Sequence, residues 1–209
     1  MTRTDPNEEA PIVHIVDDDD AVRYALMRLF GSVNLECRTY ISGDEFIEKF
    51  TGGHPGCLVV DIRMPGLSGL EVQRVFKGKG IHMPVIVITG FGDTDTGVRA
   101  MKDGAFDFIQ KPFSDQTLLD AAQSAIQTHI ELRAKERDLE NIKVRFASLS
   151  DREREVLDGI LNGDPNKRIA DKLNLSEKTI EFHRANIMKK MAARSLADLI
   201  RKTLSIEPR

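Results

Sequence analysis

Short apolar runs alternate with segments of helical apolar spacing from Ile12 to about Ile126. Runs that are apolar throughout are typical of strands buried on both faces of a parallel sheet, whereas the more polar run at 36–40 is expected at a sheet edge. The predicted strands span 12–16, 36–40, 57–60, 85–89 and 106–109. The helices predicted between them span 21–30, 44–50, 69–76 and 95–102, and a fifth follows Pro112. This alternation predicts a doubly wound α/β domain with right-handed crossovers.

The helix after Pro112 is predicted to be long, because the chain from Asp115 to about Val144 contains no Gly or Pro. Apolar residues recur in it every seven positions, at Leu118, Ala125, Leu132, Leu139 and Phe146. Such a repeat is typical of coiled coils, but the companion positions three and four residues on are mostly polar. Two interpretations stay open: the helix pairs with a second copy through Leu132 and Leu139, or it packs alone on its own domain.

Every element predicted after Ser148 is a helix. Ser150 and Glu153 fit a capping box at the start of the first one. The remaining helices are predicted at 166–173, from Ser176 to about Met191, and at 196–204. The short connection at 174–176 is what a helix-turn-helix requires.

Charge is divided unevenly between the two parts of the chain, whose formal net charge is -3. Residues 147–209 contain 13 Lys and Arg against 10 Asp and Glu, which gives +3, so the rest carries -6. This division favours nucleic acid as a partner of the C-terminal part. No stretch approaches the roughly 18 apolar residues of a membrane span. The polar, acidic segment 1–10 is unlike a signal peptide and is expected to be a disordered tail. Cys37 and Cys57 lack metal-type spacing and are expected to be buried free thiols in a reducing cytoplasm.

Reactive side chains stand at the carboxyl ends of four predicted strands. Asp17 and Asp18 follow the first strand, Asp61 the third, Thr89 closes the fourth, and Lys111 comes after the fifth. In a sheet of order 2-1-3-4-5 these ends are neighbours at the topological switch point, where ligands bind. Three close carboxylates repel one another unless a cation lies among them. Oxygen ligands without His or Cys favour Mg²⁺.

A metal ion, an ammonium and a hydroxyl around one carboxylate suit a phosphoryl group, whose transfer depends mainly on positioning and charge neutralisation. Asp61 is the expected nucleophile, because an aspartate can carry a phosphoryl group as an acyl phosphate.

The segments 16–19, 60–66, 88–90 and 108–113 (VDDD, VDIRMPG, ITG and FIQKPF) resemble the receiver domain of two-component response regulators. The resemblance implies that a sensor histidine kinase phosphorylates Asp61. It implies that Asp18, Asp61 and the Arg63 backbone carbonyl bind Mg²⁺ directly and that Asp17 does so through a water. Thr89 and Lys111 would contact the phosphoryl oxygens, Phe108 matches the aromatic switch, and Arg63 and Phe91 flank the acceptor.

This resemblance also implies a switch. Phosphorylation draws Thr89 toward the phosphoryl group, Phe108 rotates into the vacated space, and the surface of the fourth helix, fifth strand and fifth helix changes. Dimerisation through that surface is expected to strengthen promoter binding.

The motifs at 150–157, 166–170 and 175–183 resemble the four-helix LuxR-type helix-turn-helix, so the chain is similar to FixJ/NarL-family regulators, most of all to the FixJ type. The recognition helix is expected at about 177–191. Ile180, Ile187 and Met191 face inward, and Lys178, Glu181, Phe182, Ala185 and Lys189 face the major groove. The expected DNA-binding residues are Lys167, Lys178, Thr179, Glu181, Phe182, Arg184, Lys189 and Lys190. Glu181 and Phe182 are candidate base readers, although Glu181 has an alternative partner in Lys178.

The sequence therefore predicts a tail at 1–10, a receiver at 11–128, a helical linker at 129–146 and a DNA-binding domain at 147–209. The expected partners are a sensor histidine kinase, promoter DNA and a second copy of the chain. RNA polymerase is a further candidate partner. Two alternatives stay open: a regulator that binds DNA without phosphorylation, and an aspartyl phosphatase. Aspartyl phosphatases that resemble the haloacid-dehalogenase type need a second carboxylate at the position that Arg63 occupies in this chain. Arg63 therefore argues against the phosphatase. Slow loss of the phosphoryl group is expected, without turnover of external substrates.

Overall fold

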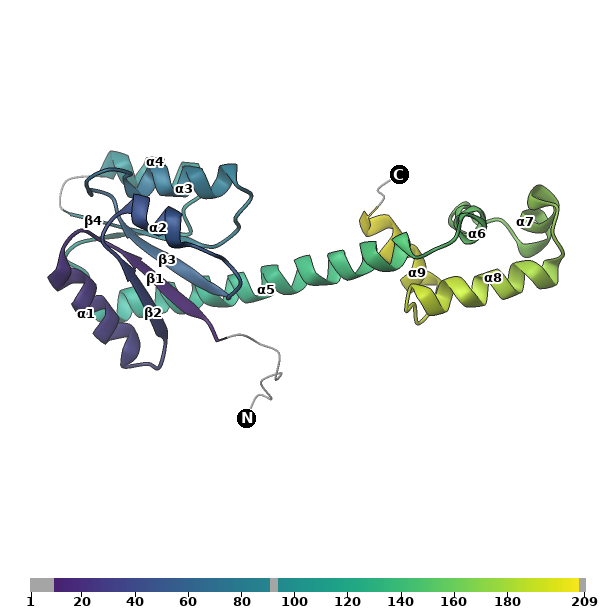
Figure 1. Ribbon diagram of the computed structural model, residues 1–209, viewed down its shortest axis with the longest axis horizontal. Helices are drawn as coiled ribbons and strands as arrows, with labels where there is room; N and C mark the ends of the chain where they lie inside the picture. The colour runs from purple at the N-terminus through teal and green to yellow at the C-terminus, as the bar shows by residue number, and fades with distance from the viewer. Residues whose placement is uncertain (1–9, 91–93, 207–209) are drawn as a thin grey trace. The chain divides into compact units, whose positions relative to one another are not determined.

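A five-stranded parallel sheet organises the N-terminal part of the chain (Figure 1). The computed structural model describes residues 10–90 and 94–206, and the side chains of these residues except 94–96. The strands are β1 (Ile12–Val16), β2 (Glu36–Tyr40), β3 (Gly56–Asp61), β4 (Val85–Thr89) and β5 (Asp107–Gln110), in the order β2-β1-β3-β4-β5. The helices between them are α1 (Asp20–Gly31), α2 (Gly43–Lys49), α3 (Gly69–Gly78) and α4 (Thr94–Asp103). The predicted doubly wound fold is confirmed, with β2 at an edge.

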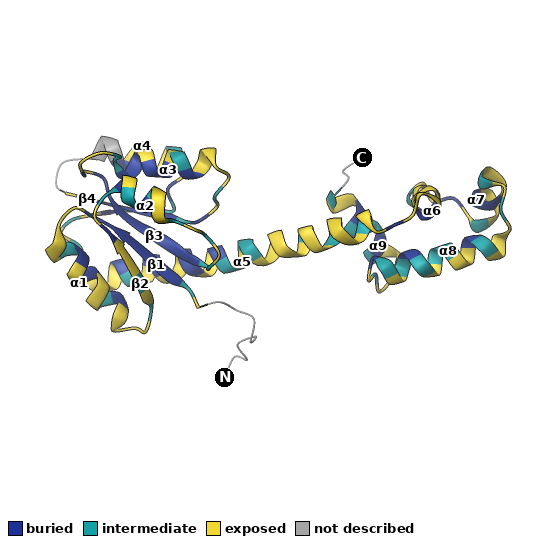
Figure 2. Cartoon of the chain, viewed as in Figure 1, coloured by how far each residue is buried: buried dark blue, intermediate teal, exposed yellow. Residues whose placement is uncertain are grey.

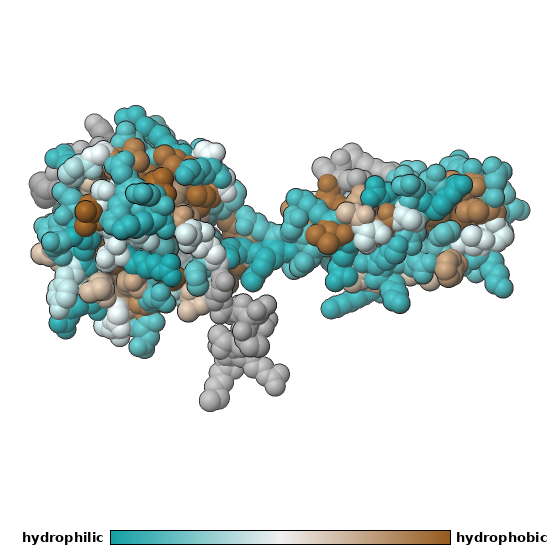
Figure 3. All heavy atoms as spheres, in the orientation of Figure 1, coloured by the Kyte–Doolittle hydropathy of each residue, from teal (hydrophilic) through white to brown (hydrophobic). Residues whose placement is uncertain are grey.

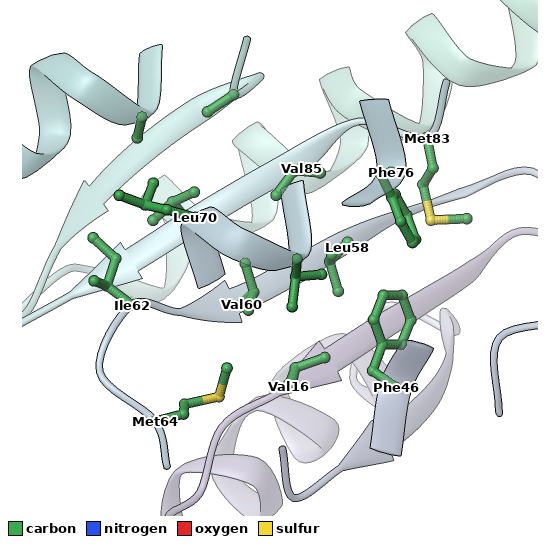
Figure 4. Close-up of a cluster of buried hydrophobic side chains, with 14 of the residues drawn as sticks. Val16, Phe46, Leu58, Val60, Ile62, Met64, Leu70, Phe76, Met83 and Val85 are labelled. Atoms are coloured by element: carbon green, nitrogen blue, oxygen red, sulfur yellow. The ribbon is translucent and has the colours of Figure 1, made fainter. Parts of the chain in front are cut away.

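Each face of the sheet is covered by its own apolar core. On one face Phe46 of α2 and Phe76 of α3 pack against Leu58 and Val60 of β3 (Figure 4). On the other face Phe30 of α1 and residues of α5 (Asp115–Ala147) pack against the alternate strand residues. The central strands are therefore buried along their whole length (Figure 2). Two-sided burial explains why their sequences are continuous apolar runs.

The helices begin where side chains satisfy free backbone N–H groups. Asp19 accepts from the Ala21 N–H at the start of α1. Ser68 and Glu71 form a complete capping box at the start of α3. These caps fix the chain directly after β1 and shortly after β3, so they also fix the loops that carry the candidate site.

The remaining helices are α5 (Asp115–Ala147), α6 (Asp151–Leu161), α7 (Asn166–Leu173), α8 (Glu177–Lys190) and α9 (Leu196–Ile206). The chain divides into two compact units that meet between Arg133 and Ala134. The boundary therefore lies within α5, and the residues that anchor its first half in the first unit include Leu118, Ala125 and Ile126. The predicted limits of the linker, 129–146, stay a prediction, as do those of the other domains.

A third core holds the C-terminal helices together. Ile160 of α6, Ile169 of α7, Ile180 of α8 and Leu199 of α9 are all buried in it, and Phe146 of α5 packs against it. The predicted capping box at the start of α6 is present, because Ser150 and Glu153 each accept from the other's backbone N–H. The predicted all-helical domain is confirmed, and α7 and α8 are joined by the short connection at 174–176 that a helix-turn-helix requires.

The seven-residue repeat in α5 has mixed surroundings. Leu118 and Ala125 are buried in the first unit, whereas Leu132 and Leu139 are half-buried and belong to none of the three cores. Polar residues dominate the exposed length of α5 in the view of Figure 3. Pairing through these two leucines therefore stays a prediction.

Several smaller expectations are modified by the structure. The fifth strand begins at Asp107, one residue later than expected, and Cys37 is only half-buried, while Cys57 is fully buried. Just before β5, the Phe106 backbone N–H donates to the Val85 carbonyl at 2.8 Å. Within the described ranges no helix is long and apolar enough to cross a membrane. The predicted tail lies, apart from Ala10, outside the described residues.

Candidate functional site

Three predicted side chains meet at the carboxyl ends of β1, β3 and β5. The ammonium of Lys111 donates to Asp61 Oδ1 at 2.8 Å and to Asp17 Oδ2 at 3.1 Å. The other Asp61 oxygen, Oδ2, accepts from the Arg63 backbone N–H at 2.6 Å. Asp17 is in turn oriented by the Asp19 N–H, which donates to its Oδ1 at 2.9 Å. Two nearly buried carboxylates are thus bridged by one cation.

The environment of this bridge is reflected in two pKa values. Burial raises the pKa of the Asp17 carboxyl above its usual range, against the opposing effects of the Asp19 N–H and Lys111. Burial also works against the charged form of Lys111, but the hydrogen bonds that its ammonium donates to Asp61 and Asp17 outweigh this effect and raise the pKa of the ammonium. Lys111 therefore stays charged, so positive charge is fixed next to Asp61.

Thr89 ends β4 beside this cluster. The Thr89 backbone carbonyl accepts from the Lys111 N–H at 2.7 Å, and Thr89 is 1% exposed. The Thr89 hydroxyl has no hydrogen-bond partner among the described residues. A buried hydroxyl without a partner is costly, so this group is suited to an acceptor oxygen that arrives at the site.

Phe108 lies on β5 opposite Val87, and Val87 is two residues before Thr89. Because side chains alternate along a strand, Phe108 and Thr89 project from the same face of the sheet. The Phe108 ring is half-buried and packs against the core of that face. The register thus places the predicted switch pair on one face.

The remaining predicted metal ligands are more open. Asp18 and Arg63 are exposed, and the described residues contain no group of three or more His, Cys, Asp or Glu side chains poised around a metal ion. The oxygen donors nevertheless fit Mg²⁺ chemically, because Asp17, Asp18, Asp61 and the Arg63 carbonyl supply only hard ligands. Phe91, predicted to flank the acceptor, lies outside the described residues.

The second candidate site is the outer face of α8. Ile180, Ile187 and Met191 are fully buried, as the spacing predicts. The opposite face exposes Lys178, Glu181, Phe182, Ala185 and Lys189. Phe182 is 64% exposed, which is unusual for a large aromatic residue in a small domain. Lys167 of α7 is exposed, whereas Arg184 is half-buried.

Three predicted DNA-binding residues have informative local contacts. Lys190 is engaged within the domain, because its Nζ donates to Glu153 Oε2 at 2.6 Å and to the Ser148 carbonyl at 3.2 Å. This engagement argues against Lys190 as a phosphate contact. Thr179 pairs with Ser176, whose Oγ caps α8. Within the described chain Glu181 forms no ion pair with Lys178, so the alternative pairing is absent.

Sequence reasoning missed the groups that position these sites. Glu153 was expected only as a capping residue, but it also holds the end of α8 through Lys190. Gly97 of α4, against which the Phe108 ring packs, carried no signal beyond being a glycine inside a predicted helix. Both relationships join residues that are distant in sequence or on separate elements, which periodicity does not reveal.

Comparison with known proteins agrees with this organisation. Residues 13–123 match the family of response regulator receiver domains, and residues 147–203 match the bacterial regulatory proteins of the luxR family. Nodulation protein W of Bradyrhizobium diazoefficiens is 46% identical over 93% of this chain and 87% of its own length. The transcriptional regulatory protein FixJ of Azorhizobium caulinodans is 43% identical over 92% of this chain and 91% of its own. A solved structure of the response regulator StyR covers 93% of this chain and 98% of that chain, at 40% identity and a TM-score of 0.87.

A receiver domain combined with a helix-turn-helix defines a two-component response regulator that acts on DNA. The chain belongs to the FixJ family of these transcription regulators, and not to a class of enzymes.

Proposed function

We propose that a sensor histidine kinase phosphorylates this regulator on Asp61 and that the acyl phosphate controls dimerisation, DNA binding and transcription. An Asp61 carboxylate oxygen would attack the phosphorus of a phosphohistidine. The P–N bond then breaks, and the imidazole of the kinase leaves with its electron pair. The observation that carries the proposal is the hydrogen-bonded ion pair of Asp61 and Lys111, next to the Thr89 hydroxyl, which has no partner among the described residues.

Each residue has a distinct expected role. Lys111 neutralises charge that builds up on the phosphoryl oxygens, since its ammonium already contacts Asp61. Thr89 donates its hydroxyl hydrogen to one of these oxygens. The Arg63 N–H fixes the rotamer of the Asp61 carboxylate through its 2.6 Å hydrogen bond.

A magnesium ion fits the same site. Asp18, Asp61 and the Arg63 carbonyl would hold it directly, and Asp17 would hold it through a water. When bound, it would supply further positive charge to the transferring group. Asp17 supports this role because the Asp19 N–H orients its carboxylate.

The consequence of phosphorylation is expected on the face of α4, β5 and α5. Negative charge at Asp61 would draw Thr89 toward it and leave room for Phe108. The exposed Val98 and Met101 of α4 provide apolar area on that face for a second receiver.

Dimers would place two copies of α8 in successive major grooves. Lys167, Lys178, Arg184 and Lys189 would contact phosphates, and Glu181 and Phe182 would read a cytosine amino group and a thymine methyl. Because promoter DNA is the proposed target, we propose that the protein acts in the cytoplasm. RNA polymerase is a further proposed partner at the promoter.

Labelling with acetyl phosphate in the presence of Mg²⁺ tests the acceptor. The wild-type chain should take up one phosphoryl group, and Asp61→Asn should take up none. Glu36→Gln is a matched control, because Glu36 is the exposed first residue of the edge strand β2, at the end of the parallel strands opposite to Asp61. Label retained by Asp61→Asn would contradict the proposed acceptor.

The coupling to DNA is tested by fluorescence anisotropy with a promoter fragment that carries the binding site. Wild-type affinity should rise on addition of beryllofluoride, and the affinity of Asp61→Asn should not. Equal wild-type affinity with and without beryllofluoride would favour the regulator that works without phosphorylation.

A further inference from the structure

The Phe108 ring occupies space that a side chain at position 97 would fill. A Cβ atom built on Gly97 would lie 2.6 Å from Phe108 Cε1, 2.7 Å from Cζ and 2.9 Å from Cδ1. Carbon atoms in van der Waals contact are about 3.5–4.0 Å apart. The ring and any residue larger than glycine therefore cannot both keep these positions.

The ring is also what requires a glycine there. Gly97 lies inside α4, where glycine is less favourable than alanine because it has more conformational freedom to lose. Its φ is not positive, so its backbone conformation is open to any residue. The contact with Phe108 is the property of this position that alanine would destroy.

Helix α4 is held from its other side, so it is not free to withdraw from the ring. Gln73 of α3, which is 4% exposed, donates from Nε2 to the Ala100 carbonyl at 3.3 Å. Arg74 donates to Asp103 Oδ2 from Nε at 3.2 Å and from Nη2 at 3.1 Å. These contacts hold the half of α4 that follows Gly97 against α3.

The Phe108 side chain is the part that can move. Its ring is half-buried, and an aromatic side chain on a strand has more than one staggered χ1 position. Thr89 projects from the same face of the sheet, beside the expected destination of the ring. A bulkier residue at position 97 would therefore push the ring away from α4 and toward the end of β4.

We propose that Gly97 is a positioning residue that sets the resting place of Phe108 and so keeps the unphosphorylated receiver in its resting state. This inference deepens the proposed function, because it rests on movement of Phe108 as the switch. A single methyl group at position 97 should shift the same equilibrium that phosphorylation shifts.

The test uses the full chain labelled with ring-¹³C phenylalanine, and Phe108→Leu identifies the Phe108 signal among the ten phenylalanines. The wild-type signal should move on addition of beryllofluoride. In Gly97→Ala without beryllofluoride it should already lie at or near that second position, and the beryllofluoride-induced shift should be largely lost. Gly78→Ala is the control, because an added Cβ there meets nothing within 4 Å.

Three results would overturn the inference. One is a Phe108 signal in Gly97→Ala that stays at the wild-type resting position. Another is a signal that moves to a position unrelated to the beryllofluoride state. The third would come from a double-mutant cycle that measures the free energy of unfolding. In that cycle we expect Gly97→Ala to destabilise the chain when Phe108 is present and to have no such effect in the Phe108→Leu background. Equal effects in both backgrounds would show that the ring does not require the glycine, even if Gly97→Ala folds poorly.

Failure of the proposed function gives a different pattern. If beryllofluoride leaves the wild-type Phe108 signal unchanged, the phosphorylation switch is wrong. Coupling between positions 97 and 108 in the unfolding cycle would still be measured.

Discussion

The ammonium of Lys190, the last residue of α8, lies 2.6 Å from the carboxylate of Glu153 in the first turn of α6. Glu153 is 4% exposed, so the carboxylate of this ion pair is largely shielded from water. Lys190 also donates to the Ser148 carbonyl, and Arg145 donates to the Lys190 carbonyl at 3.4 Å. The end of α8 is thus tied to the start of α6 and to the residues just before it.

Lys190→Met should destabilise the C-terminal domain by about 2 kcal/mol, because it removes a charged hydrogen bond from a buried carboxylate. Thermal unfolding measures this loss. Lys189→Met is the matched control, since the neighbouring Lys189 is exposed. Equal stability of the two variants would contradict a structural role for Lys190.

The same pair predicts a pH dependence. Burial opposes the charge on Glu153, but Lys190 and the N–H and hydroxyl of Ser150 outweigh it and lower the pKa of the carboxyl. A lowered pKa in the folded state gives stability that is present above the ordinary glutamate value and is lost as pH falls through the folded value. Glu153→Gln should therefore reduce the loss of stability seen in acid, below about pH 4.

His14 on β1 predicts a second pH dependence, in the receiver. Burial, with smaller effects of Arg38 and His54, lowers the pKa of the His14 imidazole to about 4. The unfolded chain binds a proton near pH 6.5, so the folded receiver loses stability as pH falls from about 6.5 to 4. The total loss is on the order of 3 kcal/mol.

Chemical denaturation of the receiver at pH 7 and pH 5 measures this effect. His14→Gln should flatten the pH dependence, because a glutamine can still pair with the Tyr40 hydroxyl, which lies 3.0 Å from His14 Nδ1. His82→Gln, at an exposed position, is the control. An unchanged slope in His14→Gln would show that the acid sensitivity arises elsewhere.

The proposed DNA-binding face of α8 predicts two kinds of effect. Lys178→Ala should weaken binding to all sequences alike and reduce the slope of log affinity against log salt by about 1. Glu181→Gln should instead change the preference at one base pair, by about 1–3 kcal/mol. Anisotropy titrations over a range of salt and of operator variants separate the two effects. Lys135→Ala, on an exposed part of α5, should alter neither.

The leucines of α5 give a prediction about assembly. If Leu132 and Leu139 pair between copies, their joint replacement by alanine should lower the dimer fraction seen by analytical ultracentrifugation. Val144→Ala is the control, because Val144 is 62% exposed on the same helix but outside the seven-residue repeat. An unchanged dimer fraction in the double variant would favour the helix that packs alone.

Local patterns in the sequence predicted those features that local physics decides. The bounds of β1, β2 and β4 and of α7 agree with the apolar periodicity, and the capping box of Ser150 and Glu153 follows from residue spacing. The edge position of β2 follows from its polarity. The tendency of sites to form at the carboxyl ends of parallel strands was enough to predict that Asp17, Asp61 and Lys111 lie close together.

What sequence reasoning missed depends on contacts between distant residues. Lys190 belongs by pattern to a basic helix end, and only the packing of α6 against α8 gives it a partner. His129 stands among polar positions of α5 but is buried, with its Nδ1 within 2.9–3.0 Å of the Gly56 carbonyl and N–H. Such pairings need the tertiary fold, since residues 56 and 129 have no relation in the chain pattern.

The contact of His129 with Gly56 has a further consequence for how motion in the receiver can be measured. Gly56 begins β3, Asp61 ends it, and all six residues between and including them are buried. Because β1 and β4 flank β3 and the His129 ring holds its first residue, the strand has little freedom to slide or tilt. It therefore offers an internal frame of reference, and displacements of α4 or of the Phe108 ring can be mapped with the backbone of β3 as the fixed origin.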